Sequence, residues 1–412
     1  MNLLLKKASL FEEINEIAIT GSKSETNRLL MLQALFANIS LKNTSNSDDS
    51  IAMENALKST ENAIDIHHAG TAMRFLTAYF AQKEGCEIVL TGSSRMQERP
   101  ISVLVDALKQ LGADIEYANK IGFPPLKING KKLTKHKVSL AANVSSQYIS
   151  ALLLIASKLE NGLELTLIGE ITSIPYIKMT LTLLNEIGVE TNFDDNIILV
   201  KPKLNIEKID YTIESDWSSA SYFYSIVALS RVGTEIKLSS YKKNSLQGDS
   251  ALAGIYTSFG VETTFTDTII GIKKVAECSI ESINLDLNNA PDIAQTIAVT
   301  CFGLQVGCHL TGLHTLKIKE TDRLEALKIE LTKLSANISV SNESLTLESS
   351  NILNDNINIA TYQDHRMAMA FAPLALKTNI IIENADVVSK SYPGFWKDLQ
   401  HIGFDLDENN AL

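Results

Sequence analysis

The sequence has little cysteine and no excess of basic charge. Its 412 residues include four cysteines, which form no Cys-x-x-Cys pair and are too few and too scattered for a disulfide framework: Cys86, Cys278, Cys301 and Cys308. The formal net charge is −11, opposite in sign to the basic balance that nonspecific nucleic-acid binding requires. We therefore expect a cytoplasmic protein without a nucleic-acid partner.

Several motifs of other enzyme classes are also missing. Neither Gly-x-Gly-x-x-Gly nor Gly-x-x-x-x-Gly-Lys-Ser/Thr occurs, which argues against a dinucleotide or nucleoside triphosphate enzyme. Two histidine pairs lack the accompanying ligands of a zinc site: His67 with His68, and His309 with His314. The sequence therefore predicts chemistry without these cofactors.

The longest uncharged run does not indicate a membrane span. Residues 293–316 contain no Asp, Glu, Lys or Arg, but glutamines, histidines and glycines interrupt them, so we predict a buried helix followed by a strand. Residues 1–7 place two lysines after a short apolar run, the reverse of the order in a signal peptide. No membrane partner is expected.

What the sequence does contain is a weak internal repeat. With 45% hydrophobic and 21% charged residues, the chain is long enough for two or three domains. Predicted helices end at four glycines within a hydrophobic-Gly-hydrophobic-acidic pattern, and at a degenerate copy around Ser335: Gly112, Gly188, Gly260 and Gly403. The period of about 70 residues leaves room for about six mixed α and β units, grouped three to a lobe.

Polar islands precede or open the predicted helices. They lie at residues 21–28, 69–74, 93–96, 316–324 and 364–366, and each contains Lys or Arg. Helix N-termini offer unpaired N–H groups and the positive end of the helix dipole, so cations placed there favour phosphate or carboxylate. Several such islands brought together predict a site for a multiply anionic substrate.

Seven motifs resemble the 5-enolpyruvylshikimate-3-phosphate synthase family, in the family's order. They lie at residues 21–28, 69–74, 95–100, 145–147, 218–221, 319–323 and 364–369. The resemblance implies an α/β (α+β) enolpyruvyl transferase fold with two lobes, each of three βαβαββ units around a buried helical core. It implies one discontinuous lobe, residues 1–20 and 215–412, and one inserted lobe, residues 21–214.

The resemblance also implies an activity. The family transfers the enolpyruvyl group of phosphoenolpyruvate to the 5-hydroxyl of shikimate 3-phosphate, in the pathway to chorismate and the aromatic amino acids. A tetrahedral intermediate forms and phosphate is released. No metal or cofactor is implied, the herbicide glyphosate is expected to occupy the phosphoenolpyruvate pocket, and we expect a monomer.

Site residues carry over position by position from this resemblance. The implied phosphoenolpyruvate contacts are Lys23, Gly70, Arg95, Gln147, Arg323, Arg366 and Lys390. The implied shikimate 3-phosphate contacts are Lys23, Ser24, Arg28, Ser145, Ser146, Gln147, Ser173, Asp292 and Lys319. The implied catalytic groups are Asp292 as the base near the 5-hydroxyl, Glu320 as the acid, and Lys23. The division of proton transfers among these three stays open.

Four positions depart from the family pattern: His68, Phe75, Ile174 and Thr315. Ile174 cannot donate a hydrogen bond, and Thr315 has a shorter reach than the usual Asn. Both are left out of the predicted site.

Each motif also has a purely structural interpretation. Ser22 and Glu25 have the spacing of a capping box, and Asp292 after Pro291 has the position of a helix cap. Either Glu320 or Asp322 could cap the helix that follows, so only one of them need be chemical. For Arg74 we favour a structural role, and for His365 a supporting one.

Two other functions remain as alternatives. The related enolpyruvyl transferase that acts on UDP-N-acetylglucosamine typically uses a cysteine on a mobile loop, whereas here Arg95 and Met96 occupy that region. A non-catalytic homologue that binds a metabolite could lose its acid-base residues, but Lys23, Asp292 and Glu320 are present. The sequence favours the enzyme of the shikimate pathway.

Overall fold

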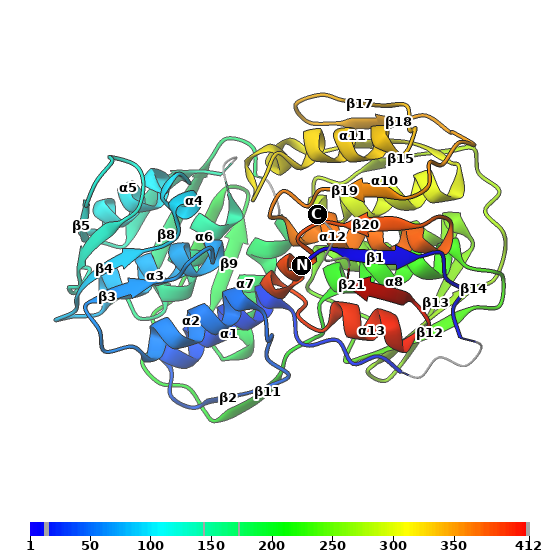
Figure 1. Ribbon diagram of the computed structural model, residues 1–412. Coiled ribbons are helices and arrows are strands. Elements are labelled where there is room, and N and C mark those ends of the chain that lie inside the picture. The colour runs from blue at the N-terminus through cyan, green and yellow to red at the C-terminus, as the bar shows by residue number, and fades with distance from the viewer. Residues whose placement is uncertain (12–15, 143–144, 172–173, 409–412) are drawn as a thin grey trace. The chain divides into compact units, whose positions relative to one another are not determined.

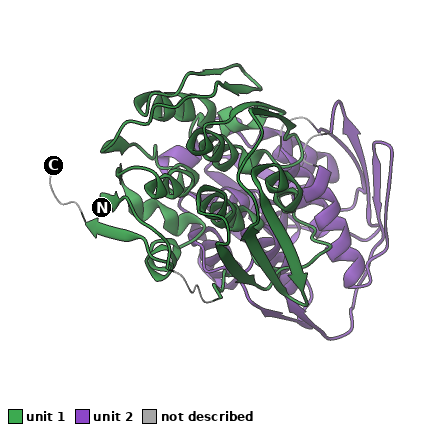
Figure 2. Cartoon of the chain, turned by 90° about the vertical axis from the view of Figure 1, so that its right-hand side faces the viewer, with its two compact units in different colours: residues 1–20, 214–412 green, residues 21–213 purple. Residues whose placement is uncertain are grey.

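The computed structural model describes residues 1–11, 16–142, 145–171 and 174–408. The chain separates into two compact units (Figure 2). The discontinuous unit consists of Met1–Thr20 and Glu214–Leu412, and the inserted unit consists of Gly21–Ile213. Each unit has its own sheets and buried helices.

The inserted unit contains two four-stranded sheets of the same topology (Figure 1). The first, in the order β3-β4-β6-β5, is formed by Ala63–Asp65, Glu87–Thr91, Leu126–Asn129 and Asp114–Tyr117. The second, in the order β7-β8-β10-β9, is formed by Lys137–Ala141, Leu163–Ile168, Ile197–Val200 and Thr191–Asp194. In both sheets the first two strands in this order are parallel to each other. The last two strands form an antiparallel hairpin, and the nearer strand of the hairpin pairs antiparallel with the second strand of the sheet.

Helices connect these strands in a βαβαββ order. Helix α3 (Gly70–Gln82) joins β3 to β4, and α5 (Ser102–Leu111) follows β4 after the short α4 (Ser94–Gln97). In the second sheet the corresponding helices are α6 (Ser146–Ala156) and α7 (Ile174–Glu186). Parallel neighbours need such a crossover connection, since a tight turn cannot join them.

The third sheet of the inserted unit is reduced to two parallel strands, β2 (Ile39–Lys42) and β11 (Ile209–Thr212). Helices α1 (Lys23–Leu35) and α2 (Asp48–Lys58) accompany it. Helix α2 ends at Lys58, and its cap residue Ser59 is extended, without the left-handed conformation that ends several of the other repeats. This is the first and least regular of the predicted repeats.

The discontinuous unit repeats the pattern with one regular and two altered sheets. The regular sheet, in the order β15-β16-β18-β17, is formed by Ser282–Asp286, Gly307–Thr311, Leu345–Leu347 and Ile338–Val340. The sheet β19-β20-β1-β21 takes β1 from the N-terminus and is formed by Ile357–Ile359, Ile380–Ile382, Leu3–Lys6 and Asp405–Glu408. The sheet β12-β14-β13 has three strands, Glu235–Ser239, Ile269–Lys274 and Val261–Thr266, and Ile17 pairs beside β12 in a parallel bridge.

One helix of each repeat is buried in the core of its unit. In the inserted unit these are α1, α3 and α6, which contact one another, and in the discontinuous unit they are α8 (Trp217–Leu229), α10 (Ala294–Leu304) and α12 (His365–Phe371). Every residue of α12 and twelve of the thirteen in α8 are buried. Such helices are covered by neighbouring elements on every face. The outer helices include α11 (Arg323–Lys333) and α13 (Phe395–His401).

The predicted repeat caps are confirmed. Gly112, Gly188, Gly260 and Gly403 all have positive φ, between 75° and 116°. Ser335, in the degenerate copy, also adopts a positive φ of 78°. Glycine reaches this region without the steric penalty that a Cβ imposes, so Ser335 keeps the cap at a cost in conformational energy.

The prediction for residues 293–316 is also confirmed. Helix α10 ends at Leu304, and its cap residue Gln305, with a φ of 63°, redirects the chain into β16. Throughout the described part of the chain, no helix combines the length and the apolar character needed to cross a bilayer.

Candidate active site

The polar islands lie at helix starts, as predicted. Lys23 begins α1 and Gly70 begins α3, while Asp322 and Asp364 are the N-caps of α11 and α12. In the discontinuous unit, hydrogen bonds join residues at the starts of α8, α10 and α12. The fold therefore gathers side chains that are far apart in the sequence.

Arg323 is the centre of a charged cluster in the discontinuous unit. Its side chain is 2% exposed. Its Nε donates to Asp364 Oδ2 at 2.6 Å, while Nη1 donates to Asp292 Oδ1 and Nη2 to Glu320 Oε2, both at 2.8 Å. Burial opposes its charge, but Asp364, Glu320 and Asp292 raise the pKa of Arg323 above its usual range. One buried guanidinium thus fixes three carboxylates.

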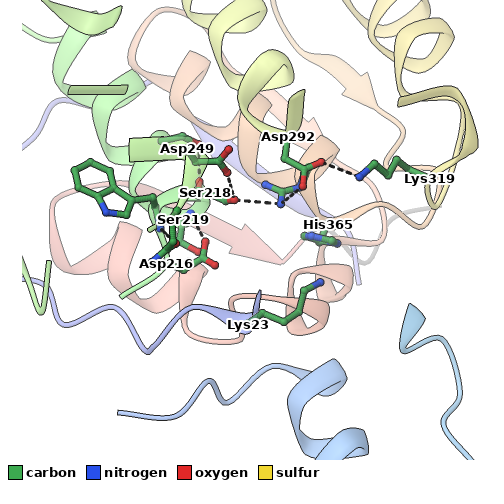
Figure 3. Close-up of polar contacts among 12 residues, drawn as sticks. Lys23, Asp216, Ser218, Ser219, Asp249, Asp292, Lys319 and His365 are labelled. Atoms are coloured by element: carbon green, nitrogen blue, oxygen red, sulfur yellow. Dashed lines mark hydrogen bonds and ion pairs between the residues drawn. The ribbon is translucent and has the colours of Figure 1, made fainter. Parts of the chain in front are cut away.

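Asp292 is surrounded by cations and does not cap a helix. It lies in the 3₁₀ turn η3 (Pro291–Ile293), whose cap residue is Ala290. Besides Arg323, its carboxylate contacts Lys319 Nζ at 3.4 Å and Arg366 Nη2 at 3.3 Å (Figure 3). Burial would raise the pKa of Asp292, but Arg366, Lys319 and Arg323 outweigh burial and hold it well below its usual range. Asp292 is therefore ionised.

The two acidic residues before α11 have separate roles. Asp322 caps the helix, since its Oδ1 accepts a hydrogen bond from the backbone N–H of Glu325 at 3.1 Å. Glu320 accepts instead from Arg323 and keeps 28% of its side chain exposed. Asp322 is therefore the cap of α11, and the Glu320 side chain is left partly exposed.

Arg366 is oriented by the start of α12. Asp364 is fully buried and accepts from the backbone N–H of Arg366 at 2.9 Å while also binding Arg323. The Arg366 guanidinium contacts Asp292 and the hydroxyl of Ser218. His365, between them in sequence, is buried. Asp364 therefore links the two arginines from within the core.

Lys390 depends on an unusual turn. Its Nζ donates to the carbonyl of Gln363 at 2.7 Å. Tyr362 and Gln363 both have positive φ, 52° and 57°, although neither is glycine. Tyr362 is held by its hydroxyl, which donates to the buried carboxylate of Glu330 at 2.7 Å. Residues in such conformations persist only where their surroundings fix them, and they are concentrated at functional sites.

In the inserted unit, Lys23 opens α1 and forms an ion pair with Asp49 at 3.7 Å. The alternative capping box at this helix does not form, because the Ser22 side chain makes no capping hydrogen bond. Ser24 contributes its carbonyl oxygen, which accepts from Arg28 Nη1 at 2.8 Å. The helix start is therefore held by a buried arginine and not by a reciprocal cap.

Arg28 is buried among neutral acceptors. Its Nε donates to Thr180 Oγ1 at 2.8 Å and its Nη2 to Ser150 Oγ at 2.9 Å. The ring of Phe75, one of the departures from the family pattern, lies 5.5 Å from its guanidinium carbon. Desolvation lowers the pKa of Arg28 to about 10. Nearby Tyr176 and the buried carboxylate of Glu25 act in the opposite direction but do not outweigh burial.

Gly70 lies against two arginines. A Cβ at this position would come within 2.6 Å of Arg99 Nη1 and 3.4 Å of Arg74 Nη1. Arg74 donates to the Gly70 carbonyl at 3.0 Å and to the Pro100 carbonyl at 3.4 Å. These contacts support a structural role for Arg74 in positioning the start of α3.

The start of α6 meets the start of α3. Ser145 caps α6 by accepting from the backbone N–H of Gln147 at 3.3 Å, and Ser146, the first residue of the helix, is nearly buried. Gln147 Nε2 donates to Thr71 Oγ1 at 3.3 Å. Arg95 on α4 is 55% exposed and pairs with Glu98 at 3.0 Å. The predicted contact Ser173 lies outside the described residues.

The other three residues that depart from the family pattern lie in different parts of the structure. His68 Nε2 is 3.6 Å from Asp48, and Ile174 begins α7. Thr315 lies in the 3₁₀ turn η4 (His314–Ile318), which leads to Lys319. None of these three residues enters the Arg323 cluster.

Sequence reasoning missed Asp249 and Glu330 and assigned no role to Ser218 or Asp364. Ser218 and Asp364 belong to motifs of the family, which was an available signal. Asp249 and Glu330 are both buried, but their neighbours show no distinctive pattern. Within the described ranges, no group of three His, Cys, Asp or Glu side chains is placed to hold a metal ion.

Comparison with known proteins gives a consistent result. The sequence profile of the EPSP synthase (3-phosphoshikimate 1-carboxyvinyltransferase) family matches residues 39–399. The 3-phosphoshikimate 1-carboxyvinyltransferase of Bacteroides fragilis strain YCH46 is 47% identical over 395 residues, covering 95% of both chains. The protein of that name from Haemophilus influenzae is 36% identical over 419 residues, covering 94% of this chain and 96% of its own.

Solved structures show the same fold. EPSP synthase from Acinetobacter baumannii aligns with a TM-score of 0.81 at 19% identity, over 99% of this chain and 100% of that chain. The enolpyruvyl transferase NikO from Streptomyces tendae aligns with a TM-score of 0.74 at 12% identity, over 100% of this chain and 99% of that chain. The predicted fold class is confirmed.

Proposed function

Because the chain belongs to the EPSP synthase family, as the sequence motifs indicated, we infer that it is a 3-phosphoshikimate 1-carboxyvinyltransferase. It transfers the enolpyruvyl group of phosphoenolpyruvate to the 5-hydroxyl of shikimate 3-phosphate and releases phosphate, in the pathway to chorismate. The observation that carries this function is the buried Arg323, which holds two acids, Asp292 and Glu320, beside the cations Lys319 and Arg366.

The addition stage requires two proton transfers, and the elimination stage requires one. A proton adds to the methylene carbon of phosphoenolpyruvate while the 5-hydroxyl loses its proton and its oxygen bonds to the adjacent carbon. The tetrahedral intermediate then loses phosphate and a proton from the new methyl group, which restores the double bond. Asp292 takes the hydroxyl proton, and Glu320 exchanges the proton with the carbon. Such positioned acids and bases contribute typically 10² to 10⁴-fold each.

The cations around Asp292 make its basicity depend on whether the substrates are bound. In the free enzyme, three cations hold the pKa of Asp292 too low for an effective base. Phosphate and carboxylate groups of the substrates compete for Lys319, Arg323 and Arg366, and each contact they take raises the basicity of Asp292. Asp292 thus becomes an effective base when the anionic substrates are bound.

The remaining assignments follow the resemblance to the family. In the inserted unit, we assign the shikimate 3-phosphate contacts to Lys23, Ser24, Arg28, Ser145, Ser146 and Gln147, and the phosphoenolpyruvate contacts to Lys23, Gly70, Arg95 and Gln147. In the discontinuous unit, we assign Asp292 and Lys319 to shikimate 3-phosphate, and Arg323, Arg366 and Lys390 to phosphoenolpyruvate. Many of these residues lie at or near helix starts, which favour anions, whereas Lys319 follows η4 and Lys390 ends the 3₁₀ turn of Ala385–Lys390.

We also propose that the two compact units are the two lobes of the enzyme and that it works as a monomer in the cytoplasm. Four free cysteines support a reducing compartment. The net charge of −11 opposes nonspecific binding to nucleic acid, and the reaction needs no cofactor. Its partners are then the two small-molecule substrates.

The test is the release of phosphate by the purified protein. We expect release only when phosphoenolpyruvate and shikimate 3-phosphate are both present, with the same rate after treatment with a chelator. Parallel reactions contain UDP-N-acetylglucosamine or no acceptor. Release with the UDP-sugar alone would favour the alternative transferase, and no release with any acceptor, despite binding of shikimate 3-phosphate, would favour the non-catalytic homologue.

A further inference from the structure

The hydroxyl of Ser218 connects a buried carboxylate to Arg366. Ser218 is the second residue of α8, and its Oγ donates a hydrogen bond to Asp249 Oδ2 (Figure 3). The same oxygen accepts from Arg366 Nη2 at 3.2 Å. That nitrogen also donates to Asp292 Oδ2 at 3.3 Å. Asp249 is thus linked through one hydroxyl to the guanidinium that contacts the proposed base.

A serine hydroxyl has one proton and two lone pairs, and the direction of the proton decides where the lone pairs point. In this structure the proton is directed at Asp249, so the lone pairs face Arg366. Without the carboxylate, the hydroxyl could turn its proton elsewhere and would no longer be a fixed acceptor for Arg366. The Asp249 carboxylate therefore keeps the Ser218 hydroxyl oriented as an acceptor for Arg366.

Asp249 occupies this position at an energetic cost. It lies in the 3₁₀ turn η1 (Gly248–Ala251), is 2% exposed, and its Oδ1 has no hydrogen-bond partner among the described residues. Burial and the nearby charges of Asp292 and Asp216 raise the pKa of Asp249 to about 6, while Arg366 and Ser218 act in the opposite direction. A half-satisfied buried carboxylate destabilises a fold, so stability does not explain it.

We propose that Asp249 is a positioning residue for enolpyruvyl transfer, which acts through Ser218 to hold the Arg366 guanidinium between Ser218 and Asp292. This inference rests on the proposed function and deepens it. It gives a role to the Ser-Ser-Ala-Ser motif at residues 218–221, which has no substrate contact among the assignments above. Arg366 is assigned to phosphoenolpyruvate, so the effect falls on this substrate.

The variants Asp249→Asn, Ser218→Ala and their combination test the link. We expect each single change to raise KM for phosphoenolpyruvate about tenfold, in line with a weakened hydrogen bond to a charged group, and to leave KM for shikimate 3-phosphate within about twofold. Because both residues act through one contact, the double variant should be no worse than the more severe single variant.

Measurements of thermal stability distinguish a positioning role of Asp249 from a structural role. Asp249→Asn removes the buried ionisable group, so its thermal midpoint at pH 8 should equal or exceed that of the wild type. The folded-state pKa of Asp249 lies above its ordinary value, so this group weakens the fold as pH rises through about 6. The advantage of Asp249→Asn should therefore shrink between pH 8 and pH 5.

A matched control is available in the same unit. Asp398 also accepts from a hydroxyl, that of Tyr392 at 2.6 Å, and burial raises its pKa as well, but this pair has no contact with Arg366. Asp398→Asn should leave both KM values unchanged.

Three results would overturn the inference: additive effects in the double variant, equal rises in both KM values, or losses of activity that parallel losses of stability. A wild-type protein that releases no phosphate would instead contradict the proposed function, so the two failures are distinguishable.

Discussion

The two units bury their arginines among different hydrogen-bond partners. In the discontinuous unit, Arg323 donates to three carboxylates within 2.8 Å. In the inserted unit, the hydrogen bonds of Arg28 go to two hydroxyls and two backbone carbonyls. Burial lowers the pKa of Arg28 to about 10, whereas the carboxylates raise that of Arg323 despite burial.

This difference indicates a division of labour. A charge already balanced by carboxylates binds an external anion only in competition with them, and it controls the pKa of those acids. A buried charge whose hydrogen-bond partners are neutral keeps a positive electrostatic potential around it, and this potential favours binding of an anionic ligand. We therefore expect the Arg323 cluster to serve proton transfer and the Arg28 helix start to serve binding of the phosphorylated acceptor.

The largest effect on stability should come from Arg323→Met. Removal of the guanidinium leaves Asp292, Glu320 and Asp364 without their shared partner, and breaking a buried ion pair costs about 3–5 kcal/mol. The loss should shrink as pH falls from 8 to 5, because protonation of the carboxylates that lost the guanidinium removes part of the cost of their buried charge. Chemical denaturation at several pH values measures the free energy of unfolding. A loss that does not vary with pH would contradict the view that Arg323 is paired with charged carboxylates.

Arg28→Met should cost less, about 1–2 kcal/mol, because its partners are neutral and partly satisfy one another. Thr180 Oγ1 already donates to Ser150 Oγ at 3.0 Å. The cost should be nearly the same from pH 5 to pH 8 in the same denaturation experiment. A strong pH dependence would mean that the nearby carboxylate of Glu25 balances the charge of Arg28, and it would remove the contrast between the units.

A smaller effect is expected at the turn before α12. Tyr362→Phe removes the hydroxyl that holds a left-handed residue to Glu330, so the Gln363 carbonyl that binds Lys390 should become less well placed. We expect KM for phosphoenolpyruvate to rise about three- to tenfold, which corresponds to the loss of roughly one hydrogen bond. Steady-state kinetics measure this, with Tyr392→Phe as the control hydroxyl. A normal KM would show that the turn holds its shape without Glu330.

The smallest effects should come from the repeat caps, one in each unit. Ser335→Gly in the discontinuous unit should stabilise the protein by about 1 kcal/mol, and Gly112→Ser in the inserted unit should destabilise it by a similar amount. A Cβ at Gly112 would meet no atom within 4 Å, so backbone conformation alone sets its cost. Thermal denaturation measures both. A change of the same sign in both variants would contradict the shared cap geometry.

The sequence was most informative where structure is local. The helix caps at Gly112, Gly188, Gly260 and Gly403 predicted the repeat, because a left-handed residue after a helix has a clear chemical signature. The degenerate copy at Ser335 was found only through its spacing. The predicted mixture of α and β units was correct, although the two-stranded sheet of β2 and β11 shows that one repeat is much reduced.

Local patterns could not predict the long-range contacts of the site. Arg323 meets Glu320 three residues away, which the sequence shows, but it meets Asp364 across 41 residues. The contact between Ser218 and Asp249 joins a helix start to a 3₁₀ turn 31 residues later. Only the packing of the buried helices brings such pairs together, and an acidic residue in the sequence carries no sign that it will be buried.

The division of labour itself is tested most directly by comparing kcat and KM for shikimate 3-phosphate in Asp292→Asn and Arg28→Lys. Asp292→Asn removes a base but keeps its shape, so kcat should fall by roughly two orders of magnitude or more with KM nearly unchanged. Arg28→Lys keeps the charge but loses the planar donor fork, so KM should rise while kcat stays within a few-fold of the wild type. The opposite pattern, or equal effects of both variants on both constants, would contradict the account.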